Sequence, residues 1–130
     1  MFTTNQLFAH LFGDYLLQSS WMARHKATDF RVALAHGMFY GIPFLLLRPS
    51  LAAWLVIVIT HALIDRGRLA RYVVWAKERL LSPPWHRVPP LAACPTGYDP
   101  AQPEWLNTWL FILTDNILHL LINGAALRWL

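Results

Sequence analysis

The sequence has few charged residues and a single cysteine. Lysine, arginine, aspartate and glutamate make up 14% of its 130 residues, whereas a soluble domain usually carries about a quarter. The lone Cys94 excludes an internal disulfide and a thiolate metal cluster. A basic N-terminal region is also lacking, since the first lysine or arginine is Arg24. We therefore expect no cleaved signal peptide.

Apolar residues dominate the composition of the chain. They account for 56% of the chain, and four apolar stretches cover about residues 5–23, 32–48, 50–66 and 105–127. Each stretch is close to the roughly 20 residues that a helix needs to cross the hydrocarbon of a bilayer. None alternates as the strand of a membrane barrel does. The sequence therefore predicts an all-α polytopic membrane protein, a single domain over residues 1–130 with four transmembrane helices.

The basic residues predict an orientation in the membrane. Nine of the eleven lysines and arginines follow the first and third apolar stretches, and the other two are Arg48 and Arg128. Because basic residues are retained on the cytoplasmic side, both termini are expected outside. Four short spans bury little area, so a homo-oligomer is also expected. Nucleic acid is not expected as a partner, because the basic residues flank apolar segments.

Between the third and fourth stretches the chain changes character. Residues 69–81 place Leu69, Val73 and Leu80 on one side of a helix, which predicts a short helix lying in the membrane interface. Seven of the nine prolines fall within residues 82–103, and proline interrupts regular elements. Residues 82–103 are therefore expected to form a proline-rich cytoplasmic loop.

Ionisable side chains recur inside the apolar stretches. In the first stretch, His10 and Asp14 are four residues apart and share one face of a helix. His61 and Asp65 repeat this spacing in the third stretch, and the fourth stretch reverses the order. Every expected span thus carries a histidine, and three carry an aspartate. The seven candidate site residues are His10, Asp14, His36, His61, Asp65, Asp115 and His119.

These side chains lie at similar depths and need a counter-charge. At a rise of about 1.5 Å per residue, all seven fall within a slab on the order of 16 Å thick. Each ionised group at the centre of a membrane helix costs about 2.5–3.5 kcal/mol. Protonation of the carboxylates, histidinium, inward folding of Arg66 and Arg68, or divalent cations could each compensate the three aspartates.

Divalent metal is the compensation that the ligand types favour. Imidazole and carboxylate suit zinc, and also manganese, iron or nickel. Two such ions would change the charge of the three aspartates from −3 to +1. We therefore predict a metal site formed by the seven residues, with Asp14, Asp65 and Asp115 as candidate catalytic carboxylates.

Four segments carry a family resemblance. They are "HLFGDYLLQSSWMARHK" (10–26), "LAHGMFY" (34–40), "THALIDRGR" (60–68) and "LTDNILHLLI" (113–122). Together they resemble domain of unknown function family 3307, a group of small bacterial and phage membrane proteins. The resemblance implies a bacterial inner membrane but no reaction. Its signature positions here are His10, Gly13, Asp14, Gln18, Met22, Lys26, His36, His61, Asp65, Asp115 and His119.

Three classes of function stay open. The leading hypothesis is a metal-dependent hydrolase acting on a lipid or other amphiphile. In support, "HLFGDYLLQ" (10–18) is similar to a zinc-binding turn of zinc-dependent phospholipase C. The alternatives are a proton or ion path along the histidines and aspartates, and a phage-type interaction protein with a structural metal. Gln6 and Asn123 are expected to join helices by hydrogen bonds, and Gly37 and Gly41 to allow a close helix contact.

Overall fold

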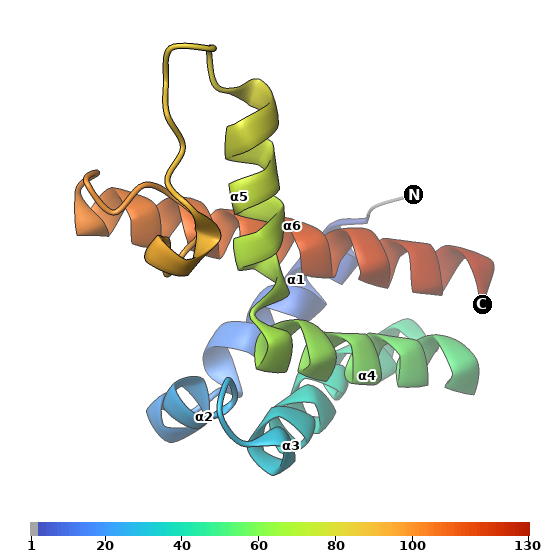
Figure 1. The fold of residues 1–130 in the computed structure, drawn as a ribbon. Helices are drawn as coiled ribbons and strands as arrows, with labels where there is room; N and C mark the ends of the chain where they lie inside the picture. The colour runs from blue at the N-terminus through green and yellow to red at the C-terminus, as the bar shows by residue number, and fades with distance from the viewer. Residues whose placement is uncertain (1–2) are drawn as a thin grey trace. The chain divides into compact units, whose positions relative to one another are not determined.

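The computed structural model describes residues 3–130, and every regular element in that range is helical (Figure 1). The all-α prediction is confirmed. In chain order the elements are α1 (Thr4–Leu11), the π-helical turn η1 (Phe12–Leu16), α2 (Ser20–His25), α3 (Phe30–Gly41), the 3-10 turn η2 (Pro43–Leu47), α4 (Leu51–Gly67), α5 (Leu69–Leu81), the 3-10 turn η3 (Leu91–Ala93) and α6 (Glu104–Trp129).

The chain divides into two compact units. The first contains the chain up to Gly67 together with His119–Leu130, and the second is Arg68–Leu118. Helix α6 supplies residues to both units, because its first part belongs to the second unit and its last part to the first. The expectation of a single domain stays a prediction.

The first expected span is broken. Helix α1 ends at Leu11, five residues continue as a π-helical turn, and residues 17–19 leave the helix before α2 begins. Ser19 starts α2 as an N-cap, because its side chain accepts a hydrogen bond from the Met22 amide. The stretch of residues 5–23 is therefore not one membrane-crossing helix.

Two of the four expected spans have the length and hydropathy of membrane-crossing helices. In the described part of the chain these are α3 with η2 (Phe30–Leu47) and α6. Helix α4 has only 17 residues, which cover about 25 Å, against about 30 Å of hydrocarbon in a bilayer. The structure therefore does not support four transmembrane helices.

Small residues bring α3 and α4 together in the first unit. A Cβ atom at Gly37 would lie 2.8 Å from the carbonyl oxygen of Val58, and one at Gly41 would lie 2.6 Å from the Val58 side chain. Trp54 on α4 also donates a hydrogen bond to the Gly41 carbonyl oxygen at 2.9 Å. The predicted close contact is confirmed.

In the second unit the proline-rich segment packs on α5. Ala70 and Val74 of α5 are buried, and Trp75 donates a hydrogen bond to the carbonyl oxygen of Pro89 at 3.0 Å. Cys94 is fully buried within the same segment. The segment has no regular element except the short η3, as its prolines predict, yet its backbone is held by α5.

The apolar side of α5 that the sequence assigns to an interface remains exposed. Leu69 and Val73 are about two-fifths exposed, and Leu80 is 81% exposed. The side that α5 buries is the one carrying Ala70 and Val74. The proposed interfacial face is therefore available for contact.

Replacing Gly37 with alanine is expected to lower stability by about 1–3 kcal/mol, because the new Cβ would press on the α4 backbone. Thermal unfolding of the detergent-purified protein measures this loss. Leu34→Ala, on the exposed side of the same helix, is the control and should change stability by no more than about 0.5 kcal/mol. An unchanged unfolding midpoint for Gly37→Ala would contradict the close contact of α3 and α4.

Candidate metal centre

Four ionisable side chains from three segments meet inside the first unit. Asp14 comes from η1 and His36 from α3, whereas His61 and Asp65 come from successive turns of α4. All four are buried, and the two histidines are completely inaccessible. The i, i+4 spacing predicted for His61 and Asp65 places both side chains on the same face of α4, facing the other two.

A glycine brings Asp14 to this position. A Cβ atom at Gly13 would lie only 2.7 Å from the carbonyl oxygen of Tyr40, so a side chain there would push η1 away from α3. Tyr40 is one turn after His36 on α3. With the two segments this close, Asp14 Oδ1 lies 3.3 Å from His36 Nε2. The π-helical geometry of η1 is of a kind that recurs at functional sites.

The ligand atoms of the four side chains converge. His36 Nε2 lies 3.0 Å from His61 Nε2, 3.3 Å from Asp14 Oδ1 and 3.5 Å from Asp65 Oδ2. His61 Nε2 lies 3.1 Å from Asp65 Oδ2 and 3.9 Å from Asp14 Oδ1. Atoms that bind a tetrahedral zinc ion at 2.0–2.1 Å are about 3.3–3.4 Å apart. The five distances lie near that value, and Asp14, His36 and His61 form one group of three side chains that could hold a metal ion.

Ring packing orients the two imidazoles. Nδ1 of His36 and Nδ1 of His61 are buried and form no hydrogen bond with the part of the chain that the structure describes. The two rings contact each other edge to face with centroids 4.8 Å apart. Tyr40 stacks on His61, with ring centroids 3.6 Å apart. Packing thus directs both Nε2 atoms toward the carboxylates.

Lys26 reaches the same carboxylates. It caps the C-terminus of α2, and its Nζ lies 2.9 Å from Asp65 Oδ2 and 3.9 Å from Asp14 Oδ1. Its side chain is 18% exposed, more than that of either aspartate. One ammonium group therefore faces two buried carboxylates at the edge of the cluster.

The sequence assigned Lys26 to the basic flank of a span, not to the site. The signal that marked it was the family signature, which includes its position. The two arginines considered as counter-charges bind elsewhere. Arg66 donates a hydrogen bond to the carbonyl oxygen of Ala27, and Arg68 donates one to that of Pro95.

His119 extends the cluster on the other side of Asp65. Its Nε2 lies 3.8 Å from Asp65 Oδ1, and its ring centroid lies 4.2 Å from that of His61. His61, Asp65 and His119 thereby form a second group of three side chains that could hold a metal ion, beside the group of Asp14, His36 and His61. Asp65 thus presents one oxygen to each side.

His10 belongs to an adjoining hydrogen-bond network. Asn123 Nδ2 donates to the Tyr40 hydroxyl at 2.5 Å, and that hydroxyl lies 2.8 Å from His10 Nδ1. Gln6 donates to the carbonyl oxygen of Leu120 at 2.7 Å. The predicted helix-joining roles of Gln6 and Asn123 are confirmed. Since Tyr40 also stacks on His61, the network is packed directly against the cluster.

Asp115 is in neither group of ligand atoms. It is half-buried on α6, one turn before His119, in the part of that helix that belongs to the second unit. Its predicted roles as ligand and catalytic carboxylate stay predictions, as does a metal-binding role for His10. The structure brings together the remaining five candidates, which are Asp14, His36, His61, Asp65 and His119.

Fold and site together define a helical protein with a buried cluster of imidazoles and carboxylates that could hold a metal ion. The chain belongs to the family described as "Protein of unknown function (DUF3307)", whose model matches residues 2–127. The resemblance found in the sequence is therefore confirmed. No curated protein and no solved structure matches the chain.

Tyr40→Phe is expected to destabilise the protein by about 1–3 kcal/mol, because Asn123 and His10 would each lose a buried hydrogen-bond partner. Thermal unfolding checks this. Tyr72→Phe removes a hydroxyl from a half-exposed tyrosine on α5 and should leave the unfolding midpoint unchanged. Equal midpoints for the two variants would show that the hydroxyl of Tyr40 contributes nothing to the network.

Proposed function

We propose that this chain is a membrane-embedded protein that binds a divalent metal ion, with zinc as the ion that best suits its ligands. The observation that carries the proposal is the convergence of buried ligand atoms, since His36 Nε2 and His61 Nε2 lie 3.0 Å apart and each lies within 3.9 Å of Asp14 Oδ1 and Asp65 Oδ2. A divalent ion would neutralise the two carboxylates, which are otherwise costly to bury.

The distribution of polar and apolar side chains supports a bilayer as the solvent. In the first unit, four histidines are buried. Large apolar side chains point outward instead, among them Phe8 (66% exposed), Leu16 (70%) and Leu46 (85%). Extensive exposed apolar surface marks membrane or protein interaction sites, and ionisable residues of membrane proteins face the interior of the helix bundle.

Four membrane-crossing segments remain part of this proposal, because the basic residues after the first and third segments share one side only if all four cross; α3–η2 and α6 are the two with the length of a full crossing. The break after η1 is of a kind that membrane proteins tolerate, because irregular backbone can line a polar interior. Once Lys26 is assigned to the cluster, eight basic residues remain against two. That asymmetry supports a bacterial inner-membrane protein with both termini outside. Self-association through the exposed apolar surface is part of the same proposal.

The reaction we propose is hydrolysis of an ester or phosphoester in an amphiphilic substrate. A bound divalent ion would polarise the scissile group and lower the pKa of water. His36, His61 and Asp65 would hold the ion. Asp14 would act as the general base, because it makes the longest of the five contacts, 3.9 Å to His61 Nε2, and is the more exposed carboxylate.

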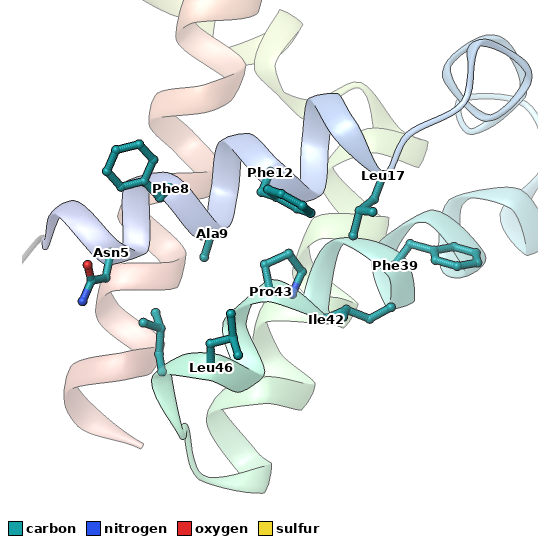
Figure 2. A pocket seen from close by; sticks show the side chains of 10 residues that line it. Asn5, Phe8, Ala9, Phe12, Leu17, Phe39, Ile42, Pro43 and Leu46 are labelled. Atoms are coloured by element: carbon teal, nitrogen blue, oxygen red, sulfur yellow. The ribbon is translucent and has the colours of Figure 1, made fainter.

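An apolar groove on the first unit supports an amphiphilic substrate. It has a volume of about 660 Å³ and lies between the segment containing α1 and η1 and the segment containing α3 and η2. Figure 2 shows Phe8 and Phe12 on one side, and Phe39 and Ile42 on the other. The groove thus adjoins the same two segments that supply Asp14 and His36.

One observation favours a second function, that of a structural metal centre. Four buried side chains already direct ligand atoms at one another, and structural zinc sites are closed by four protein ligands, whereas catalytic sites keep one position for water or substrate. The two functions differ in whether Asp14 is needed for retaining the ion or for turnover.

Metal analysis tests the binding of the ion. The wild-type chain, purified in detergent and dialysed, is expected to retain about one divalent ion per molecule by mass spectrometry, and His61→Ala to retain close to none. His86→Ala, which changes an exposed histidine on the proline-rich segment, should retain as much as the wild type. Equal metal content in wild type and His61→Ala would overturn the proposed site.

Turnover tests the assignment of Asp14. In nanodiscs, the metal-loaded protein is expected to hydrolyse bis-p-nitrophenyl phosphate or a p-nitrophenyl acyl ester. Asp14→Asn should keep its metal and lose about 10²–10⁴-fold in rate, as expected when a general base is removed. His86→Ala is again the matched control. Metal loss from Asp14→Asn, with no turnover of either probe by the wild type, would instead favour the structural centre.

A further inference from the structure

We propose that Lys26 is the resident cation of the centre and that a metal ion binds by displacing its ammonium group. Lys26 would then determine how tightly the site holds the ion. This inference rests on the proposed metal binding and adds a specificity-determining residue to it. Its observation is that one ammonium group contacts Asp65, which would ligate the ion, and lies near Asp14, whose charge the ion would balance.

The geometry places lysine and metal in competition. Lys26 Nζ lies 2.9 Å from Asp65 Oδ2, the oxygen that also faces His36 and His61 at 3.5 and 3.1 Å. It lies 3.9 Å from Asp14 Oδ1, the oxygen that faces the same imidazoles at 3.3 and 3.9 Å. The ammonium group therefore contacts Asp65 Oδ2, the oxygen that would ligate the ion, and lies near Asp14 Oδ1, which faces the same two imidazoles.

The charge balance of the site favours either the metal ion or the Lys26 ammonium group, but not both together. With neutral histidines, Asp14, Asp65 and Lys26 sum to −1. A divalent ion bound with Lys26 still in place would give +1, whereas the same ion without Lys26 would give 0. Because an uncompensated charge is costly in a buried site, the neutral arrangement is favoured. Metal entry and departure of the ammonium group are thus coupled.

Lys26 has a route out of the cluster. It is the cluster's most exposed side chain, and its ammonium group sits on a flexible four-carbon stem. Helix α2, which it caps, has no buried residue, so its packing does not fix the lysine in place. The side chain can turn outward while α3 and α4 keep the two imidazoles in position.

Affinity measurements on the full chain test the displacement. Zinc is titrated against a chromophoric chelator with wild type, Lys26→Met, Lys26→Arg and Arg24→Met. Lys26→Met is expected to bind zinc about tenfold or more tightly than wild type, a difference of about 1.4 kcal/mol, because no ammonium group must leave. Lys26→Arg is expected to bind more weakly, because guanidinium holds carboxylates in a bidentate manner.

Arg24→Met is the matched control. It removes a positive charge from the same short helix, but Arg24 donates to the Ser20 carbonyl oxygen and is exposed. Its zinc affinity should equal that of the wild type. If Arg24→Met tightens binding as much as Lys26→Met, the effect is one of general charge and the displacement is wrong.

Stability provides a second readout. Without metal, Lys26→Met leaves two carboxylates without their ammonium partner, so its unfolding temperature should fall and zinc should raise it by more than in wild type. Should Lys26→Met fail to fold, recovery of folded protein on purification with zinc supports the proposal. If zinc does not restore folding of Lys26→Met, the zinc titration is carried out with Lys26→Gln, which is then expected to bind zinc more tightly than wild type.

The two proposals fail in different ways. If wild type binds zinc and Lys26→Met binds no more tightly, the displacement is overturned while the metal site stands. If only Lys26→Met binds zinc, the ammonium group excludes the ion from the native chain, and both the metal binding and its displacement of Lys26 are overturned. If no variant binds zinc, both proposals are overturned.

Discussion

Two buried carboxylates constrain the centre of this protein. Asp14 and Asp65 have lost most of their contact with solvent, and their charge must be balanced locally because a buried charge without a partner is strongly unfavourable. In the structure, the ammonium group of Lys26 and the imidazoles of His36 and His61 all face Asp65 Oδ2. The packing of α3 and α4 around the cluster therefore satisfies this electrostatic requirement and also buries apolar side chains.

Close backbone contacts make the arrangement possible. Gly13 lets η1 approach Tyr40, and Gly37 lets α3 approach Val58. The first approach carries Asp14 to His36, and the second carries His36 to His61. The helix break before α2 has a similar consequence, because it allows Lys26 to return to the cluster instead of continuing along a straight helix. Departures from regular helix thus coincide with the positions that build the site.

The expectation of four transmembrane helices is not supported, and for the first segment the reason is physical. Hydropathy measures how well a segment partitions into hydrocarbon, but it does not register a π-helical turn or a serine that starts a new helix. Helix α4 is apolar along most of its length, yet its 17 residues fall short of a full crossing. The two segments that best fit a membrane helix are α3–η2, which changes to a 3-10 turn at Pro43, and α6, which is continuous over 26 residues.

The sequence by itself determined the helical class, the family and most of the cluster, because i, i+4 spacing fixes which side chains share a helix face. Only the tertiary structure decided which candidates meet. It joined Asp14, His36, His61 and Asp65, added His119, and placed His10 in a network with Tyr40. It also brought Lys26 into the site, since the direction of a side chain after a helix break depends on packing between distant segments, which periodicity does not encode.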